Sequence, residues 1–173
     1  DGYLKTTKHD HALMALYRLA EDVGALQNAR QYTDMTQALI IAGFGQEAER
    51  VMQKGIDASL FAGDEATRAK RTIDAAKRKA DAERAALPKA ASALAAARTG
   101  DEMEKVGELY FSAGDYVNAS AALQKAIAKG GLSDADSAQM LLGIALKRKG
   151  DKANATKAFD LVKEPQFAEI AKL

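Results

Sequence analysis

Apolar residues return at every third or fourth position along most of this chain, and short polar breaks separate the apolar runs. Such spacing is typical of helices that bury one face. From 10 to 24, "DHALMALYRLAEDVG" places Leu13, Leu16, Tyr17 and Ala20 on one side of a helix. The pattern therefore predicts helices joined by short turns rather than strands.

The segment 65–98 carries a narrower version of this pattern. Its apolar positions step alternately by three and four residues, which gives a seam of Ala66, Ala69, Ile73, Ala76, Ala80 and Leu87. Pro88 then suits the first turn of a new helix, which we expect to run to about Arg98. The segment thus predicts a helix pair with an unusually long first arm.

Two stretches of the chain share one pattern 36 residues apart. They are "GELYFSAGDYVNASAALQKAI" at 107–127 and "GIALKRKGDKANATKAFDLVK" at 143–163. Both open with glycine, both pass through Gly-Asp, and both continue with Asn-Ala-x-x-Ala. The recurrence predicts that each stretch folds into the same structural unit.

The shared glycines and aspartates define that unit. Gly107 and Gly143 would lie within a first helix, where the missing side chain lets a neighbouring helix approach closely. Gly114 and Gly150 can end that helix in the left-handed conformation, and the aspartate after each favours a new helix start. Each unit is therefore predicted to be a helix, a tight turn and an antiparallel helix.

These units resemble the tetratricopeptide repeat, a helix pair with a period of about 34 residues. The positions that match its pattern are Met103, Val106, Gly107, Tyr110, Ala119, Leu123 and Ala126 in one unit and Gln139, Leu142, Gly143, Leu146, Ala155, Phe159 and Val162 in the next. The tryptophan of the family pattern is lost in both units, and its closing proline is displaced to Pro165. The resemblance implies an all-α fold, a right-handed superhelical array of antiparallel helix pairs.

An upstream segment extends the array. "AGFGQEAERVMQKGI" at 42–56 matches 113–127 at a shift of 71 residues, about twice the period. The whole chain, 1–173, is then one domain. Its expected units are a partial one at 10–28, pairs at 29–60, 65–98, 101–130 and 134–164, and a C-terminal helix at 165–173.

Most of the chain is also similar to a group of exported proteobacterial tetratricopeptide-repeat proteins. That resemblance implies a periplasmic or otherwise exported setting, although the residues alone leave a cytoplasmic setting open. The partial first unit suggests that the chain is the C-terminal part of a longer array.

Composition excludes several kinds of chemistry. The net charge of +1 gives no attraction to nucleic acid or to anionic lipid, and no apolar run is long enough to cross a membrane. The chain has no cysteine, so Cys-type zinc sites, disulfides and Cys nucleophiles are absent. We therefore expect no nucleic-acid partner, no membrane insertion and no cofactor.

No set of residues converges on a catalytic or metal site. His9 and His11 are the only histidines, and residues two apart on a helix do not face each other. A Gly-x-Ser-x-Gly motif and a phosphate-binding loop are also missing from the sequence. We therefore predict no metal and no enzymatic activity.

Two further motifs are explained by ordinary helix surfaces. The long arm carries an excess of three cations, a small excess for a nucleic-acid site, because Glu65, Asp74, Asp81 and Glu83 interleave with Arg68, Lys70, Arg71, Lys77, Arg78, Lys79 and Arg84. Asn118-Ala-Ser120 and Asn154-Ala-Thr156 fit the N-glycosylation pattern, but their shared place in the repeat explains both.

The family resemblance also predicts a binding surface, because the first helix of each pair lines a concave groove. The residues that it places there are Thr33, Gln37, Ile40, Glu104, Glu108, Phe111, Met140, Ile144 and Lys147. In the best-known groove of this family, cations at set positions clamp a peptide carboxylate, but those positions here hold Thr33, Gln37, Glu104, Glu108, Met140 and Ile144. Carboxylates beside apolar residues instead favour a basic or amphipathic segment.

Two functions follow from this interpretation. The first is a non-catalytic scaffold that binds a peptide or partner helix on its concave face. The alternative is a structural or assembly module of a larger cell-envelope complex, with a groove filled by its own chain.

Overall fold

The computed structural model describes residues 8–165, and this part of the chain is helical without any strand. The expectation of an all-helical fold is therefore confirmed for these residues. The helices are α1 (Lys8–Asp22), α2 (Ala29–Ala42), α3 (Gly45–Asp57), α4 (Asp64–Ala86), the 3₁₀ turn η1 (Leu87–Lys89), α5 (Ala90–Ala96), α6 (Gly100–Ser112), α7 (Tyr116–Lys129), α8 (Ala135–Lys149) and α9 (Lys152–Asp160).

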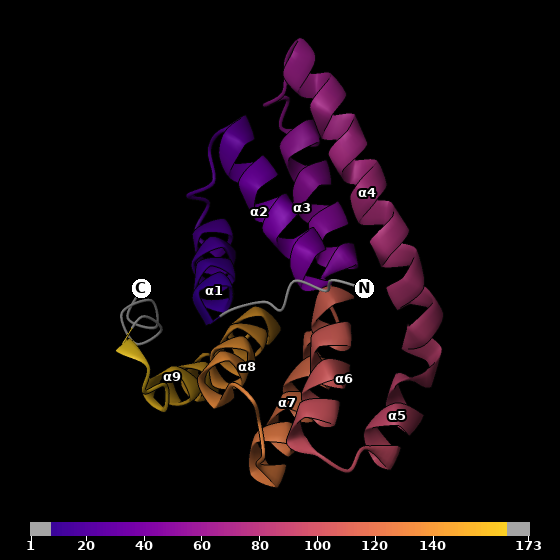
Figure 1. Cartoon of the computed structure of the whole chain (residues 1–173). Helices are drawn as coiled ribbons and strands as arrows, with labels where there is room; N and C mark the ends of the chain where they lie inside the picture. The colour runs from indigo at the N-terminus through magenta and orange to yellow at the C-terminus, as the bar shows by residue number, and fades with distance from the viewer. Residues whose placement is uncertain (1–7, 166–173) are drawn as a thin grey trace.

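The helices form two groups that α4 connects (Figure 1). α1, α2 and α3 lie in the upper group of that view, and α5 to α9 lie in the lower one. α4 runs down one side from the first group to the second, while α1 and α3 meet the second group through α8 and α6. The two groups therefore contact each other away from the α4 connection.

The repeated glycines allow close packing within the helix pairs, as the sequence predicted. A Cβ on Gly107 would overlap the side chain of Leu123, and a Cβ on Gly143 would overlap the ring of Phe159. The overlapping residue stands 16 positions after the glycine in both units. Each glycine thus makes room for the same apolar position on the second helix of its own pair.

The Gly-Asp turns also behave as predicted. Gly114 and Gly150 adopt φ values of 82° and 93°, the left-handed region. Asp115 caps α7 by accepting from the backbone N–H of Asn118 at 3.0 Å, and the Nδ2 of Asn118 donates to the same carboxylate at 2.6 Å. The capping aspartate and asparagine of α9 repeat both bonds. The recurring asparagine therefore has a structural role in closing the turn.

The turn between α2 and α3 lacks the aspartate that caps the second helix in the later turns. Gly43 is again left-handed, with φ of 90°, but Phe44 stands where the later turns have aspartate, and α3 has no side-chain cap of its own. Glu83 of α4 supplies the missing acceptor, because its carboxylate receives the N–H groups of Gly45 at 2.9 Å and Gln46 at 2.8 Å. The same carboxylate accepts from the hydroxyl of Ser112 at 2.8 Å, which links α3, α4 and the end of α6.

The buried face of α4, the predicted long arm, agrees with the predicted seam. The buried residues of α4 are Ala69, Ile73, Ala76 and Ala80, and this face packs on α3. Pro88 lies in the short 3₁₀ turn, and the helix that follows ends at Ala96, slightly before the predicted Arg98. Small residues on the seam let α4 approach the start of α3 so closely that a Cβ on Gly45 would overlap the α4 backbone.

The buried side of α1 differs from the predicted one. Leu13 and Leu16 are 37% and 40% exposed, whereas Ala12, Ala15 and Leu19 are buried. Because α1 packs on α8 as well as on α2, the face that contacts α8 decides its orientation. The predicted stripe assumed a single packing partner, and it is wrong for these two leucines.

Apart from Pro165, the expected C-terminal helix at 165–173 lies outside the described residues. Within residues 8–165, none of the helices has both the length and the apolar character needed to cross a bilayer.

We expect Glu83→Ala to lower the free energy of unfolding by about 1–2 kcal/mol, because the orphan N–H groups at the start of α3 lose their acceptor. Urea titration followed by circular dichroism measures the change. Glu65→Ala is the matched control, since Glu65 is exposed on the same helix. Equal losses in the two variants would show that the cap contributes nothing.

Candidate functional site

A buried arginine lies at the junction of the two helix groups. Arg18 of α1 is 4% exposed, and its guanidinium lies 4.4 Å from the ring centre of Phe44 and 4.8 Å from that of Phe111. It donates to both carboxylate oxygens of Glu47, from Nε at 3.0 Å and from Nη2 at 2.8 Å. A two-pronged bond of this kind fixes the relative position of α1 and α3.

A second arginine completes this network. The guanidinium of Arg148, near the end of α8, donates to Glu47 at 3.3 Å and to the hydroxyl of Tyr116 at 3.2 Å. It also pairs with Asp22 at 3.0 Å and with Glu21 at 3.3 Å, at the end of α1. We call Arg18, Glu47, Arg148, Glu21 and Asp22 the junction network.

The electrostatics of the junction network favour the charged forms of Glu47 and Arg148. Burial opposes ionisation of Glu47, but Arg18, Arg148 and Arg50 outweigh it and lower the pKa of this carboxyl. The pKa of Arg148 is raised, because the neighbouring carboxylates and Tyr116 outweigh its own burial. Glu47 is therefore an ionised acceptor shared by two cations.

Sequence reasoning missed this network. Arg18 stands between Tyr17 and Leu19 in an apolar run, which is the only hint that it is buried. Glu47 and Arg148 belong to polar stretches that look like solvated helix surface. Their partners come from helices separated by as many as 130 positions in the chain, so no local pattern reveals them.

A cleft of about 350 Å³ opens beside the junction network. Its lining residues are Glu21, Asp22, Glu47, Arg50, Val51, Lys54, Tyr116 and Arg148. Positive and negative side chains are equal in number, and Lys54 and Arg148 are already paired with carboxylates in the wall. The cleft differs from usual small-molecule sites, which are mostly apolar with a few polar groups.

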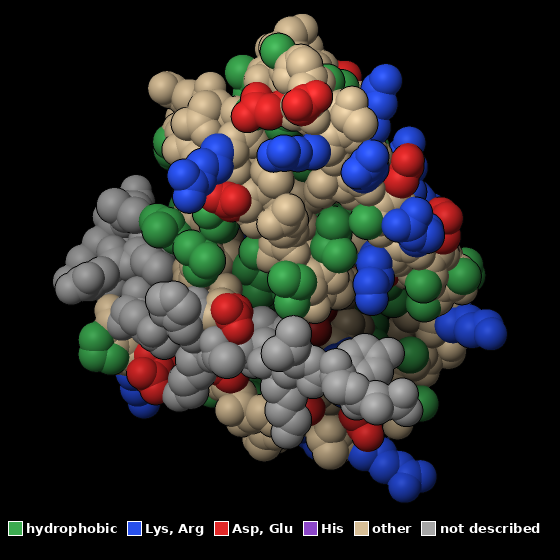
Figure 2. All heavy atoms as spheres, turned by 45° about the horizontal axis from the view of Figure 1, so that its top comes forward, with side chains coloured by type: hydrophobic (Ala, Val, Ile, Leu, Met, Phe, Trp, Pro, Cys, Tyr) green, Lys and Arg blue, Asp and Glu red, His purple; other side chains and the backbone are tan. Residues whose placement is uncertain are grey.

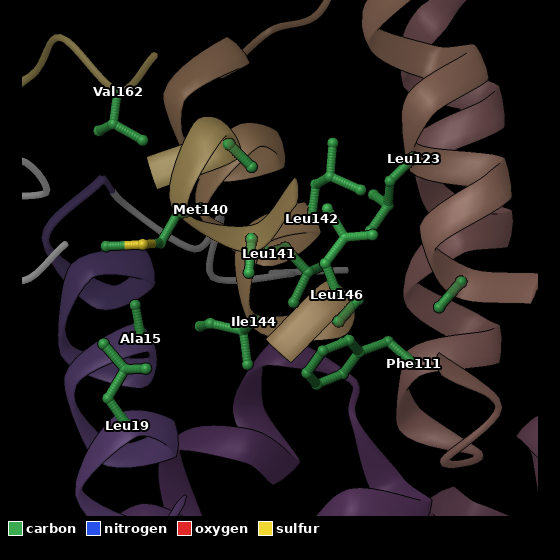
Figure 3. Close-up of a cluster of buried hydrophobic side chains, with 14 of the residues drawn as sticks. Ala15, Leu19, Phe111, Leu123, Met140, Leu141, Leu142, Ile144, Leu146 and Val162 are labelled. Atoms are coloured by element: carbon green, nitrogen blue, oxygen red, sulfur yellow. The ribbon is translucent and has the colours of Figure 1, made fainter. Parts of the chain in front are cut away.

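Three of the predicted groove residues belong to the core. Phe111, Met140 and Ile144 are at most 1% exposed. Figure 3 shows why, since Ala15 and Leu19 on α1 point towards Met140 and Ile144 on α8. These three positions therefore do not line an open groove, because they belong to one core cluster with Ala12, Ala15 and Leu19 of α1.

The predicted acidic pair lies at the edge of this packed face. Glu104 and Glu108, one turn apart on α6, are half-buried rather than exposed. Burial, then Glu108, Asp101 and Asp134, raises the pKa of Glu104 to about 8. Burial raises the pKa of Glu108 to about 7, although Arg18 and Lys105 oppose it.

The other predicted groove residues are dispersed. Thr33 lines a separate cleft of about 210 Å³ between α2 and the start of α4, with Phe61 and Arg68. Gln37 is exposed on α2, and Ile40 packs against the core of the first helix group. Lys147 pairs with Asp22 of α1 at 3.6 Å. The structure thus does not bring the nine residues together on one open surface.

Of the two histidines, only His11 has its side chain in the described part of the chain. His11 of α1 lies with Nδ1 3.4 Å from the carboxylate of Asp134, and neither atom has a hydrogen bond. The side chain of His9 lies outside the described part of the chain. Among the described residues, no cluster of three or more His, Cys, Asp or Glu side chains is suited to hold a metal ion.

The basic residues of α4 lie on an ordinary charged surface. Arg84 pairs with Glu49 and with Asp81, the latter at 3.0 Å. On the face shown in Figure 2, Lys and Arg side chains are interspersed with Asp and Glu rather than gathered in one patch. This mixture is typical of a solvated face.

Comparisons with known proteins leave the geometry as the main guide to function. No protein-family model, no curated protein and no solved structure matches this chain.

We expect Glu47→Gln to lower the free energy of unfolding by about 3–5 kcal/mol, because it leaves two buried guanidinium groups without their shared anion. Glu49→Gln is the matched control on the same helix, since its partner Arg84 is exposed and solvent screens a pair of that kind. Chemical denaturation of both variants gives the comparison. A loss below about 1 kcal/mol for the first variant would contradict the central role of Glu47.

The acidic pair predicts how stability depends on pH. The folded chain keeps protons on Glu104 and Glu108 up to about pH 8 and 7, whereas an ordinary glutamate releases its proton near 4.5. This contribution to stability is therefore complete below about pH 4.5 and is lost as the pH rises to about 8.

Glu104→Gln should accordingly raise the melting temperature by several degrees near pH 8.5 and change it little near pH 4.5. Differential scanning calorimetry across this range measures the effect. Glu102→Gln is the control, because Glu102 is exposed on the same helix, has a lowered pKa, and Gln can retain its capping box. A gain for Glu104→Gln that is independent of pH would show that the cause is not titration.

Proposed function

We propose that this chain is a non-catalytic protein-interaction module of the helical-repeat type. We call the state in which α1 occupies the inner face of the module the assembly form, and the state with an open peptide-binding groove the scaffold form. The proposal is that the chain has the assembly form. The paired helices, the repeated Gly-Asp turns and the matching Gly107 and Gly143 contacts support the repeat interpretation. The right-handed superhelical array of tetratricopeptide repeats is part of this proposal. So is the exported setting, which rests on the sequence resemblance alone.

One observation favours the assembly form over a free peptide-binding groove. The surface that would receive a peptide on α6 and α8 is covered by α1, through Ala12, Ala15 and Leu19. The junction network holds α1 in this place with ion pairs to α3 and α8. A peptide would have to displace a helix that is already both packed and paired.

One observation favours the scaffold form, in which the chain offers an open groove to a peptide. The cleft between α2 and α4 is open and includes Thr33, a predicted groove residue, beside the ring of Phe61. Arg30 and Arg68 stand with Asp34 and Glu65 in its wall, so a bound segment would meet both signs of charge. A short extended peptide fits this description better than a helix the length of α1.

The two forms can be separated through the methionines of the unmodified chain. Met140 lies between α1 and α8 and is 1% exposed, while Met35 and Met52 are buried in the first helix group. In the assembly form, the labelled methyl group of Met140 is as well protected from a soluble paramagnetic agent as those of Met35 and Met52. Half-buried Met103 serves as the accessible reference.

Methyl NMR spectra with and without the agent measure this protection. Relaxation of Met140 at the rate of Met103 would show that α1 leaves the groove open, and the scaffold form would replace the assembly form. A partner protein obtained with the intact chain should then be titrated. In the assembly form it leaves the Met140 resonance in place, whereas groove binding shifts it.

A further inference from the structure

We propose that the docking of α1 onto α6 and α8 is coupled to proton binding at Glu108, which lies under α1, so that α1 is held in mildly acidic solution and released as the pH rises. This inference deepens the proposed function and rests on its central point, that α1 is the occupant of the inner face. It adds a condition under which the face becomes available to a partner.

The geometry places Glu108 under α1. A small cavity of about 10 Å³ lies between α1, α6 and α8, and its polar lining consists of His11, Arg18, Glu108 and Ser137. Met14 and Ala15 of α1 close the cavity against Met140 and Ile144. Glu108 already lines a neighbouring cavity with Glu83 and Lys105, and movement of α1 away from this face would open its other side to water.

The acidic pair lacks the compensation that other buried carboxylates receive. Glu47 accepts from two guanidinium groups, and Glu83 accepts from two backbone N–H groups and a hydroxyl. Within the described residues, neither Glu104 nor Glu108 has a salt bridge within 4.0 Å. A buried carboxyl without such partners favours its neutral, protonated form.

The charged groups that face the pair come from four helices. α1 contributes His11 and Arg18, while α8 contributes its N-cap residue Asp134. α6 contributes Asp101 and Lys105, and α4 contributes Glu83 through a neighbouring cavity that Glu108 also lines. Once both glutamates are ionised, the carboxylates in this group outnumber the cations.

Ionisation therefore favours release. With α1 docked, the pKa of Glu104 is raised to about 8 and that of Glu108 to about 7. With α1 undocked, hydration returns Glu108, which lines the cavity under α1, towards its ordinary value of 4.5. The docked state thus holds up to one more proton at Glu108 between about pH 4.5 and 7, and the release equilibrium rises by up to tenfold for each pH unit in this range.

The remaining contacts of α1 oppose release or do not depend on pH. Arg18 attracts an ionised Glu108 and acts against release, but burial has the larger effect on that group. The junction network is a pH-independent part of the attachment, because its carboxylate Glu47 has a lowered pKa.

The absence of cysteine in this chain makes a direct test possible. Ala15→Cys places one thiol on the buried face of α1, where the native side chain is 3% exposed. The labelling rate with dithiodipyridine is divided by that of Ala153→Cys, an exposed position on α9, which removes the intrinsic pH dependence of the thiol. We expect this normalised rate to rise about tenfold or more between about pH 5.5 and 8.5.

Two variants and one reference position make the test specific. Adding Glu104→Gln and Glu108→Gln should hold the rate near its low-pH value throughout, whereas Glu65→Gln on α4 should leave the rise intact. Ala48→Cys reports the core of the first helix group, where Ala48 is fully buried. A parallel rise at this position would mean global unfolding and would overturn the proposal.

The outcomes also separate this inference from the proposed function. A rate that is low at every pH keeps α1 as the groove occupant and overturns only the proton coupling. A rate as high as that of Ala153→Cys at every pH overturns both. The Met140 methyl resonance of the unsubstituted chain should follow the same titration, which guards against a packing defect from Ala15→Cys.

Discussion

Glu47 is the charge on which the arrangement of this molecule depends. It lies on α3, yet it accepts from an arginine of α1 and an arginine of α8, so one carboxylate joins three helices. The rings of Phe44 and Phe111 enclose Arg18 from two sides and exclude water from the pair. In such surroundings a charge is tolerated only with its partners in place, which favours this one arrangement of the helix groups.

Phe44 illustrates how one substitution in a repeat redirects the fold. In the later turns an aspartate at this position caps the next helix from within the same unit. Phenylalanine cannot cap, so α3 takes its acceptor from Glu83 on α4, and the ring becomes free to stack on Arg18. The loss of a local cap thus appears together with two long-range contacts, one to the long arm and one to α1.

The packing of α1 has a consequence for function. An array of helix pairs offers its inner face to partners only where that face is uncovered. In the proposed array, α1 covers that face where it packs on α8 and shares a core cluster with Phe111 of α6. In the proposal, half-buried Glu108 at the edge of this contact makes the attachment of α1 sensitive to protonation, whereas the arginine network makes it persistent. In this proposal, α1 is held both by a contact that depends on pH and by ion pairs that do not.

The sequence by itself determined the local structure. Helix periodicity, the Gly-Asp turns and the close approach at Gly107 and Gly143 follow from backbone sterics and from contacts within one unit, and all are found as predicted. The buried seam of α4 was also visible in the sequence, because its residues pack mainly on α3, the preceding helix.

Only the tertiary structure decided the long-range contacts. The side of α1 that is buried, the burial of Met140 and Ile144, and the pairing of Arg18 with Glu47 depend on which distant helix covers which face. A sequence pattern reports that a residue is apolar or charged at helical spacing, but not what lies opposite it. Burial of a charge is stable only when a partner is supplied from elsewhere in the fold, so it leaves no local signature.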